Sequence, residues 1–229
     1  MNYSYQIVCL ANSKKPGGRC VAGKISLGQQ RYQWIRPVAP RQNRTITLQD
    51  QVYANGKYPE LLDIIRITYV GYQPSTFQQE NHVIDNSIRW EHIGKLNPNH
   101  LDTLVDEPDQ LWETMRNDST SGINDRIAGE ILTQQRASLY LIEPENVRIR
   151  VSAEGAQWDD NRLRVRAFFD YNGIHYGLMV TDLAFESRYT QLGIGLYDPE
   201  NIRLFTVSLG EIDQRGYAYK LVAAVFHGA

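Results

Sequence analysis

The 229-residue sequence contains only two cysteines, Cys9 and Cys20, and both lie inside apolar runs. An unpaired cysteine in such a run behaves as a small hydrophobic residue, and proteins that depend on disulfides usually have more cysteines and a signal peptide. The first residues, MNYSYQIVCL, lack the basic stretch and the long apolar run of a secretion signal. We therefore expect free thiols in a cytoplasmic protein, although pairing of neighbouring strands would also allow a disulfide.

Long apolar runs and an excess of either charge are also missing. No window reaches the roughly 18 apolar residues of a membrane span, and 24 basic against 26 acidic residues leave a formal net charge of -2. Proteins that bind nucleic acid without selectivity usually have a basic excess, because their affinity comes from neutralised phosphates. Any site for a polyanion must therefore be local.

Residues suited to metal binding or catalysis are scattered. The five histidines fall one to an element, and a Cys-His nucleophile pair would require a cysteine to leave the core. Asp170 and Asp182 each end an expected strand, with Glu186 one helical turn beyond, so a metal-dependent phosphoesterase is one alternative. Aspartate at a strand end is more often a turn or helix-capping residue. We expect no catalytic residue, no metal and no cofactor.

The first part of the chain, residues 1–95, reads as a small antiparallel barrel or sandwich. Three β-type runs, Gln6–Ala11, Cys20–Ile25 and Tyr32–Val38, predict an antiparallel meander in which Asn12–Arg19 is a polar loop. Three further strands are expected, a short edge strand within Thr45–Tyr53, a buried strand at Leu61–Tyr72 and a last one at Ser87–Ile93.

The pattern changes over residues 96–136, which we expect to be a helical connector and linker. Asn97 or Asn99 can cap a helix to about Val105, and Pro108 at a first helical position starts another to about Met115. Asn117–Asp125 has almost no apolar content and predicts an exposed linker, and one further helix is expected at Arg126–Gln135.

Strands resume over residues 137–229. They are expected at Ser138–Ile142, Val147–Ala153, Arg162–Tyr171, Ile174–Thr181, Ile202–Ser208 and Tyr217–Phe226. A tight turn at Asn172-Gly173 joins two of them, and Leu183–Tyr189 favours a helix. The predicted fold class is therefore all-β with a short helical connector, built as two small antiparallel β-barrels in tandem.

The polar loop of the first unit is the leading candidate for binding an anion. Its glycines allow backbone N–H groups to approach a ligand, and its cations supply charge. The alternative is a plain hairpin loop in which Asn12 and Ser13 bond to their own backbone. The candidate residues of this loop are Asn12, Ser13, Lys14, Lys15 and Arg19.

Trp34 and Arg36 are the second candidate, because alternation places both on one face of their strand. An exposed tryptophan beside an arginine is typical of a platform that stacks a base and holds a phosphate. The commoner arrangement is a core tryptophan with the arginine turned outward.

A set of arginines in the second half is the third candidate. Alternation puts Arg162, Arg164 and Arg166 on one face of a strand, and Arg148 with Arg150 on one face of the expected neighbour. They could follow a phosphate backbone, but nearby acidic residues favour cross-strand pairing; these are Glu143, Glu145, Glu154, Asp159 and Asp160. Lys220, inside an apolar strand, is expected to be edge-exposed or paired, with Glu211 as the candidate partner.

Three motifs in order, CLANSKKPGGRCVAG, WIRPV and SLGEIDQRGYAYKLVAAV, resemble the prokaryotic family of dual OB-fold domain proteins. The resemblance covers both ends of the chain but not residues 96–136. It implies tandem OB barrels that bind nucleic acid or nucleotides, often near anti-invader systems. The family motif residues map onto Asn12, Ser13, Gly18, Arg19, Cys20, Trp34, Arg36 and Pro37, and onto Ser208, Leu209, Gly210, Glu211, Gly216, Tyr217 and Lys220.

From these observations we expect a non-catalytic module that recognises nucleic acid or a nucleotide as part of a prokaryotic defence system, with a partner protein encoded nearby. The alternatives are a protein-interaction scaffold without a nucleic-acid ligand and the metal-dependent phosphoesterase.

Overall fold

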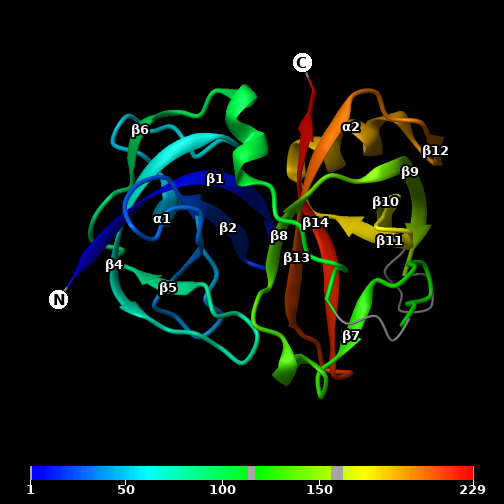
Figure 1. Cartoon of the computed structure of the whole chain (residues 1–229), viewed down its shortest axis with the longest axis horizontal. Helices are drawn as coiled ribbons and strands as arrows, with labels where there is room; N and C mark the ends of the chain where they lie inside the picture. The colour runs from blue at the N-terminus through cyan, green and yellow to red at the C-terminus, as the bar shows by residue number, and fades with distance from the viewer. Residues whose placement is uncertain (1, 113–116, 156–161, 229) are drawn as a thin grey trace. The chain divides into compact units, whose positions relative to one another are not determined.

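The computed structural model describes residues 2–112, 117–155 and 162–228 (Figure 1). The chain forms two compact units. The first, unit 1, comprises Met1–Val105 with Arg136–Ser138, and the second, unit 2, comprises Asp106–Gln135 with Leu139–Ala229. Residues of the expected connector, 96–136, fall in both units, and the domain limits stay a prediction.

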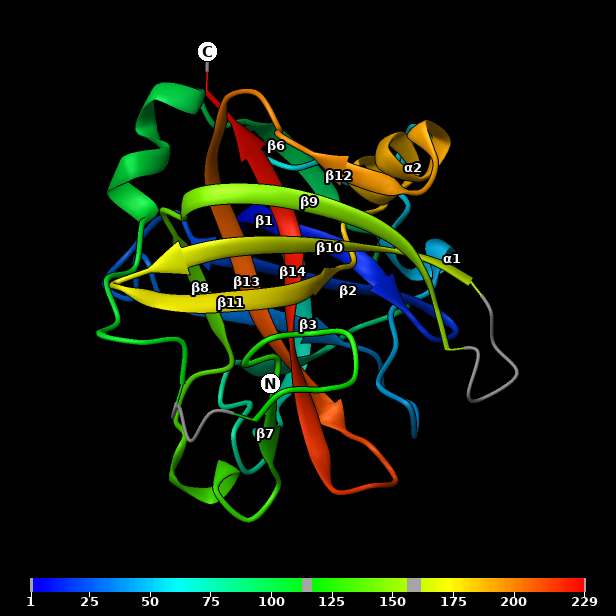
Figure 2. The same cartoon turned by 90° about the vertical axis from the view of Figure 1, so that its right-hand side faces the viewer.

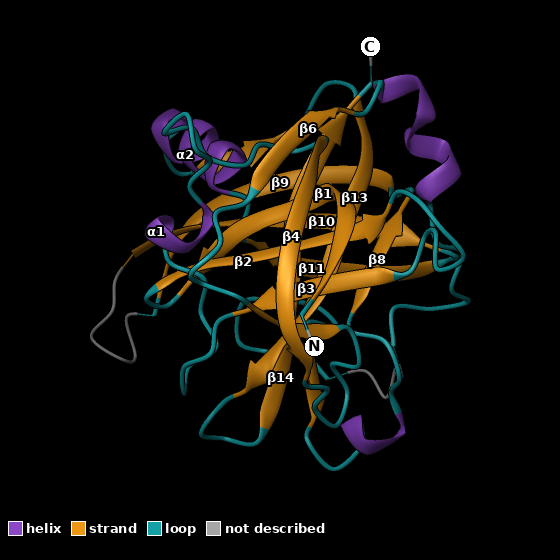
Figure 3. Ribbon diagram, turned by 90° about the vertical axis from the view of Figure 1, so that its left-hand side faces the viewer, coloured by secondary structure: helices purple, strands orange, loops and turns teal. Residues whose placement is uncertain are grey.

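Unit 1 is built mainly from strands (Figure 3). Its elements in chain order are β1 (Tyr3–Lys15), β2 (Gly18–Ile25), β3 (Trp34–Val38), α1 (Leu48–Gln51), β4 (Asp63–Tyr72), β5 (Asn81–Ile84), β6 (Glu91–Lys95) and the 3-10 helix η1 (Pro98–Leu104).

The strands of unit 1 close into a barrel. Neighbours follow the order β1-β2-β3-β5-β4, and β4 pairs with β1 to complete the circle. The pairs are antiparallel except β3 with β5, which run parallel with Arg36 opposite Asn81. A long β1 makes closure feasible, since residues from Ile7 onward pair with β2 while Tyr3–Val8 pair with β4. The barrel is filled by alternate, mostly β-branched side chains such as Ile7, Val21 and Ile65.

Unit 2 repeats this arrangement with additions (Figure 2). Its elements are β7 (Arg126–Ala128), the 3-10 helix η2 (Leu132–Gln134), β8 (Leu139–Ile142), β9 (Glu145–Glu154), β10 (Arg162–Tyr171), β11 (Ile174–Val180), α2 (Leu183–Leu192), β12 (Gly195–Tyr197), β13 (Ile202–Ile212) and β14 (Tyr217–His227).

The sheet of unit 2 follows the order β12-β9-β10-β11-β14-β13-β8. Again one inner pair, β11 with β14, is parallel. Only Glu143 and Pro144 separate β8, at one end of this path, from β9, which lies next to β12 at the other end, so the chain itself links the two sides of the sheet. β8 and β9 together therefore occupy the place that β1 has in unit 1. The break falls at a proline, which has no N–H to donate to a strand ladder.

A segment from the middle of the chain completes unit 2. Residues 117–128, which we call the wedge segment, pair with β11 through Ile123 opposite Gly177 and with β14 through β7. The backbone of Lys220 also donates to the carbonyl of Asp125 at 2.8 Å. Because β11 and β14 pair directly only near Met179 and Val180, the wedge segment supplies partners for backbone groups that the sheet would otherwise leave unpaired.

The predicted all-β class with tandem barrels is confirmed. The opening meander pairs as expected, and β4, β8, β9, β10, β11, β13, β14 and α2 lie where the pattern put them. The hairpin between β10 and β11 turns at Asn172 and Gly173, which both have positive φ. None of the helices within the described ranges has the length and apolar character needed to cross a membrane.

Four local expectations are wrong. Instead of an edge strand within Thr45–Tyr53 the chain forms α1, because Thr47 and Asp50 make a reciprocal capping box. The loop expected at Asn12–Arg19 is mostly strand, with the turn confined to Pro16 and Gly17. Short β5, with buried Asn81 and His82, is not among the strands expected from the sequence.

The fourth wrong expectation is the helical connector at residues 96–136. The helix after Asn97 is the 3-10 helix η1, and the expected helix at Arg126–Gln135 is replaced by β7 and η2. The residues from Pro108 to Trp112 are not helical, and the rest of that expected helix lies outside the described residues. Ile127 and Ala128 illustrate the cause, since pairing with β14 satisfies their backbone better than an isolated short helix would.

Both cysteines are free, as expected. A disulfide between them is also excluded by register. Cys9 lies opposite Gly23, whereas Cys20 lies opposite Ser13. The two cysteines are thus offset by four positions on β1 and three on β2, which puts their Cα atoms well beyond the separation that a disulfide spans.

Candidate functional site

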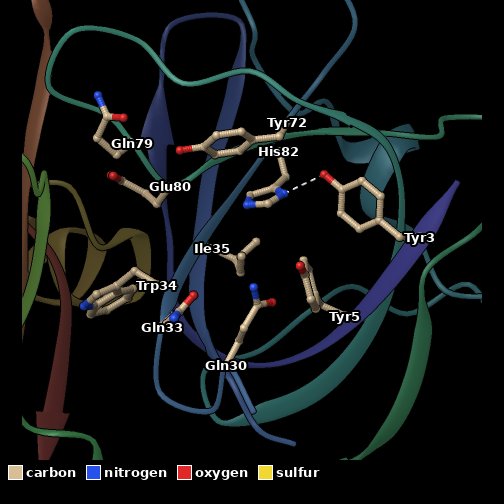
Figure 4. Close-up of a pocket in the computed structure, with 10 residues that line it drawn as sticks. All are labelled: Tyr3, Tyr5, Gln30, Gln33, Trp34, Ile35, Tyr72, Gln79, Glu80 and His82. Carbon is tan, nitrogen blue, oxygen red and sulfur yellow. Dashed lines mark hydrogen bonds between the residues drawn. The ribbon is translucent and has the colours of Figure 1, made fainter. Parts of the chain in front are cut away.

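A hollow in unit 1, which we call the aromatic pocket, is the best-formed candidate site (Figure 4). Its volume is about 410 Å³, within the range of about 300–1,000 Å³ that small-molecule sites occupy. The lining residues are Tyr3 and Tyr5 of β1, Gln30 and Gln33 of the β2–β3 loop, Trp34 and Ile35 of β3, Tyr72 of β4, Gln79 and Glu80 of the β4–β5 loop, and His82 of β5.

The tyrosines reach the aromatic pocket because of strand periodicity. Tyr3, Tyr5 and Ile7 alternate along β1 and therefore share one face. Ile7 is fully buried in the core, whereas Tyr3 and Tyr5 continue this face beyond the core and are only partly buried. β1 thus passes from the core of the barrel to the wall of the pocket within four residues.

His82 ties the aromatic side chains together. Its Nδ1 lies 2.7 Å from the hydroxyl of Tyr3, and its ring centroid lies 5.0 Å from that of Tyr72 and 5.6 Å from that of Tyr5 (Figure 4). Burial lowers the pKa of His82 to about 4, so the imidazole is neutral at pH 7. Burial likewise raises the pKa of Tyr3. The pocket therefore presents uncharged aromatic groups on this side.

Glu80 places a carboxylate at the opposite side of the pocket. It is 8% exposed, and its Oε1 accepts from Ser138 Oγ and lies 3.4 Å from Nη2 of Arg36. Within the described part of the chain, Oε2 has no hydrogen-bond partner. One carboxylate oxygen is thus held by the protein while the other remains available.

The structure separates the expected pair on β3. Trp34 is partly exposed and lines the aromatic pocket, as a stacking role requires, with Lys24 Nζ 5.2 Å from the centre of its ring. Arg36 is only 4% exposed, and its charge faces Glu80 instead of solvent. A surface role for Arg36 as a phosphate ligand does not fit this position, because a buried guanidinium needs its own counter-charge.

The N-terminal hairpin residues serve mainly to hold the hairpin in place. Asn12 Nδ2 donates to Pro59 O at 2.9 Å and to Gln51 Oε1 at 3.1 Å, and buried Ser13 donates to Cys20 O. Lys15 Nζ donates to Asn43 O. Arg19 is partly exposed, and its backbone bridges to Ile46. Lys14 is exposed at the end of β1. None of these residues is among those lining the aromatic pocket in the described structure.

The arginines of unit 2 are largely paired. β10 and β9 are neighbours as expected, with Arg166 opposite Arg150 and Phe168 opposite Arg148. Arg166 is 6% exposed and bonds both Glu154 and Asp125, and Arg148 Nε lies 3.3 Å from Asp198.

The remaining arginines differ in exposure. Arg150 donates to Ser121 O and stacks over Phe168, while Arg162 and Arg164 lie toward the more exposed start of β10. Of the expected acidic partners, Glu154 is used, and Asp159 and Asp160 lie outside the described residues. The arginines therefore do not form one open cationic surface.

Lys220 is fully buried instead of lying at an edge. Its Nζ donates to Asn124 Oδ1 at 2.9 Å and lies 5.2 Å from the ring centre of Tyr176, so the expected pairing with Glu211 is not the one that forms. Burial lowers the pKa of Lys220 to about 7, partly opposed by the charge of Asp125. Lys220 contributes to the interior of unit 2.

The expectation of an exposed linker at Asn117–Asp125 is wrong. Asn124 is 3% and Asp125 1% exposed. Asp125 accepts from the backbone and hydroxyl of Ser119, at 2.7 and 2.6 Å, as well as from Arg166. Asn124 and Asp125 are buried despite their polarity because their polar groups find partners, while the rest of the segment is at least partly buried apart from exposed Thr120. The segment also covers part of the β9–β10 face, where a second hollow of about 450 Å³ remains between it and Arg150.

The aspartates of the phosphoesterase alternative are used elsewhere. Asp182 caps α2 through Phe185 N at 3.1 Å and accepts from Val225 N at 3.0 Å. Asp170 bonds Asn146 and His175, which lower its pKa. In the described residues no group of His, Cys, Asp or Glu is arranged to hold a metal ion.

Sequence reasoning missed most of the aromatic pocket. Trp34 was identified, but Tyr3, Tyr5, Glu80 and His82 were not. One signal was available: two tyrosines alternate ahead of the apolar run at Ile7, so β1 begins with aromatic residues on its core-facing side. His82 and Glu80 carry no such signal, because the parallel pairing of β5 with β3 brings them to the site.

Neither the curated proteins nor the solved structures contain a match to this sequence. The family model described as a dual OB-containing domain matches residues 5–225. This range includes both units. The strand path of unit 1 is closed by the pairing of β1 with β4, and each unit has the inner parallel pair described above. The chain therefore belongs to the family of dual OB-containing domains.

Proposed function

We propose that unit 1 binds nucleic acid or a nucleotide by seating a base in the aromatic pocket, and that the protein performs no chemistry on it. OB folds are typical oligonucleotide-binding folds, and their ligands contact the second and third strands and the loops after the first and fourth. The aromatic pocket uses β3 and the loop between β4 and β5. The pocket thus shares β3 and the β4–β5 loop with the usual ligand face, whereas none of its described lining residues comes from β2 or from the loop after β1.

The observation that carries this proposal is the set of aromatic walls. Tyr3, Tyr5, Trp34 and Tyr72 line one hollow that is open to solvent. Stacking on aromatic side chains is the main sequence-tolerant interaction in single-strand binding. An aromatic cluster with a purely structural role would be expected to close on itself, whereas Tyr72 is 55% exposed.

The test is binding of labelled single-stranded DNA and RNA, followed by fluorescence anisotropy and by the emission of Trp34. Binding that quenches this emission and is weakened in Tyr5→Ala supports the proposal. Recovery of the oligonucleotide unchanged supports a role without chemistry. Absence of binding by the folded protein would favour the scaffold alternative.

The place of this module in a prokaryotic defence system forms part of the proposal and derives from the family resemblance. It would act as the recognition component beside a partner protein. Co-purification with the product of a neighbouring gene, in the presence and absence of oligonucleotide, tests that part separately.

A further inference from the structure

The polar atoms that the aromatic pocket offers at its Glu80 side are hydrogen-bond acceptors. Oε2 of Glu80 has no partner among the described residues, while Oε1 is fixed by Ser138 and lies beside Arg36. The carboxylate is 8% exposed. Oε2 is not among the fully enclosed polar atoms that lack a partner, so it is accessible from the hollow, where a donor group of a ligand can reach it.

Gln79, which precedes Glu80 and also lines the pocket, likewise offers a hydrogen-bond acceptor. Its Nε2 donates to Ser75 O at 2.7 Å and to Thr76 O at 3.3 Å. Its donor group is therefore engaged, and the amide oxygen is left to accept from a ligand. Gln79 and Glu80 thus present acceptors from consecutive positions of the β4–β5 loop (Figure 4).

The charge of the pocket points to a base and not to a phosphate. Of its described lining residues none is lysine or arginine, whereas Glu80 is acidic. A phosphate placed here would face the carboxylate of Glu80, and the neighbouring cations are already engaged, Arg36 beside Glu80 and Lys24 with Leu104 O. A ligand must therefore enter base first and keep its phosphates outside the pocket.

Bases differ in what they present to such acceptors. Uracil and thymine show two carbonyl oxygens around one N–H, so a carboxylate would face their acceptors. Guanine shows two adjacent donors, N1–H and the 2-amino group, which match a carboxylate in the way that charge-assisted bidentate pairs do. Building on the function proposed above, we infer that the aromatic pocket selects guanine, with Tyr and Trp stacking on the ring and Glu80 accepting from its donor edge.

The test uses the full chain and oligothymidine strands that carry one central guanine, hypoxanthine, adenine, cytosine or thymine. We expect guanine to bind at least about tenfold tighter than thymine, the range of a hydrogen bond to a charged group. Hypoxanthine lacks the 2-amino group and should fall between them. Guanosine, its monophosphate and its triphosphate should compete within about threefold of one another, because the phosphates remain outside.

The variant Glu80→Gln removes the charge that distinguishes the bases. It should reduce the preference for guanine over thymine to about threefold or less, with little change for the all-thymine strand. Glu91→Gln removes an exposed carboxylate of the same unit, paired with Arg66, and should leave the preference intact. Because Glu80 also faces buried Arg36, Glu80→Gln must first be shown to fold by circular dichroism. If it does not, the base series on the unmodified protein decides.

The outcomes separate this inference from the proposed function. Equal affinity for all central bases would overturn the guanine preference and leave base binding in place. No binding of any strand would overturn both. An aromatic wall beside a carboxylate also suits an organic cation, so tetramethylammonium is included as a competitor. Displacement of the strand by tetramethylammonium at lower concentration than by guanosine would reassign the pocket to a cation.

Discussion

The guanidinium of Arg166 and the carboxylate of Asp125 lie 3.1 Å apart, with side chains only 8% and 1% exposed. Asp125 belongs to the wedge segment and Arg166 to the middle of β10, so this pair joins the connector to the barrel of unit 2. Glu154 contacts the same guanidinium at 2.9 Å. Two carboxylates therefore balance one buried cation.

Asp125→Asn should destabilise unit 2. Removing one partner of a buried ion pair leaves a charge poorly compensated, at a cost of about 3 kcal/mol, the low end of the usual range because Glu154 remains. Urea unfolding measures the change. The control Asp198→Asn removes an exposed pair with Arg148 and should cost less than about 1 kcal/mol. If both substitutions lowered the free energy of unfolding equally, the buried pair would contribute no more to stability than the exposed one.

This pair also shows why part of the fold was predictable and part was not. β10 was assigned at Arg162–Tyr171 because period-two alternation and the Asn172-Gly173 turn are local signals. The burial of Asp125 depends on Arg166, which is 41 positions away. A polar segment with Ile123 as its one apolar side chain looks like a linker until its partners are known, so Asn117–Asp125 was misread.

The candidate site likewise contains one residue that could be predicted from the sequence and others that could not. Trp34 was identifiable since tryptophan beside a basic residue is itself a local pattern. Glu80 and His82 reach the aromatic pocket only through the pairing of β5 with β3 and β4. Those pairings are long-range, and β5 has only four residues, two of them polar. A short strand of this kind has no periodicity from which it can be recognised.

Stacking in the aromatic pocket leads to a prediction for its walls. Trp34→Ala and Tyr5→Ala should each weaken single-strand binding by about 5- to 150-fold, since stacking one base contributes about 1–3 kcal/mol. Anisotropy titrations measure this. Tyr58→Ala removes a tyrosine of unit 1 that is 47% exposed and outside the pocket, and it should bind like the unmodified protein. Unchanged affinity in Trp34→Ala would place the ligand elsewhere.

The salt dependence of binding should be shallow. The described lining of the aromatic pocket contains no cation, and each neutralised phosphate of a single strand adds about −0.7 to the slope of log K against log salt concentration. We expect a slope shallower than about −1.5. Arg148→Glu should leave it unaltered, because Arg148 already pairs with Asp198. A steep slope that Arg148→Glu flattens would return the binding role to the arginines of unit 2.

His82 predicts a loss of stability in mild acid. Its folded pKa is about 4, against an ordinary value of 6.5. Between these values the unfolded chain binds the extra proton, so the free energy of unfolding decreases as pH falls from about 6.5 toward 4. Relative to His82→Gln, the unmodified protein should lose about 1–2 kcal/mol between pH 7 and pH 5. Exposed His100 gives the control His100→Gln, which should keep the full acid dependence. If His82→Gln keeps it too, His82 is not the group responsible.

Burial of Lys220 predicts a change in stability at alkaline pH. Its folded pKa is about 7, lowered by burial from 10.5. Above pH 7 the folded lysine releases its proton while the unfolded one keeps it, so stability should rise with pH up to about 10; below pH 7 both forms are protonated and the contribution is constant.

The measurement compares the unmodified protein with Lys220→Met at each pH, which cancels the titration of other groups. The difference should grow in favour of the unmodified protein by about 2 kcal/mol between pH 7 and pH 9. Lys220→Met leaves Asn124 Oδ1 without its donor, but this cost does not depend on pH. Lys57→Met, at an exposed lysine, should show no such trend. A pH-independent difference for Lys220→Met would mean that the buried ammonium keeps its proton, stabilised by Asn124, Asp125 and the ring of Tyr176.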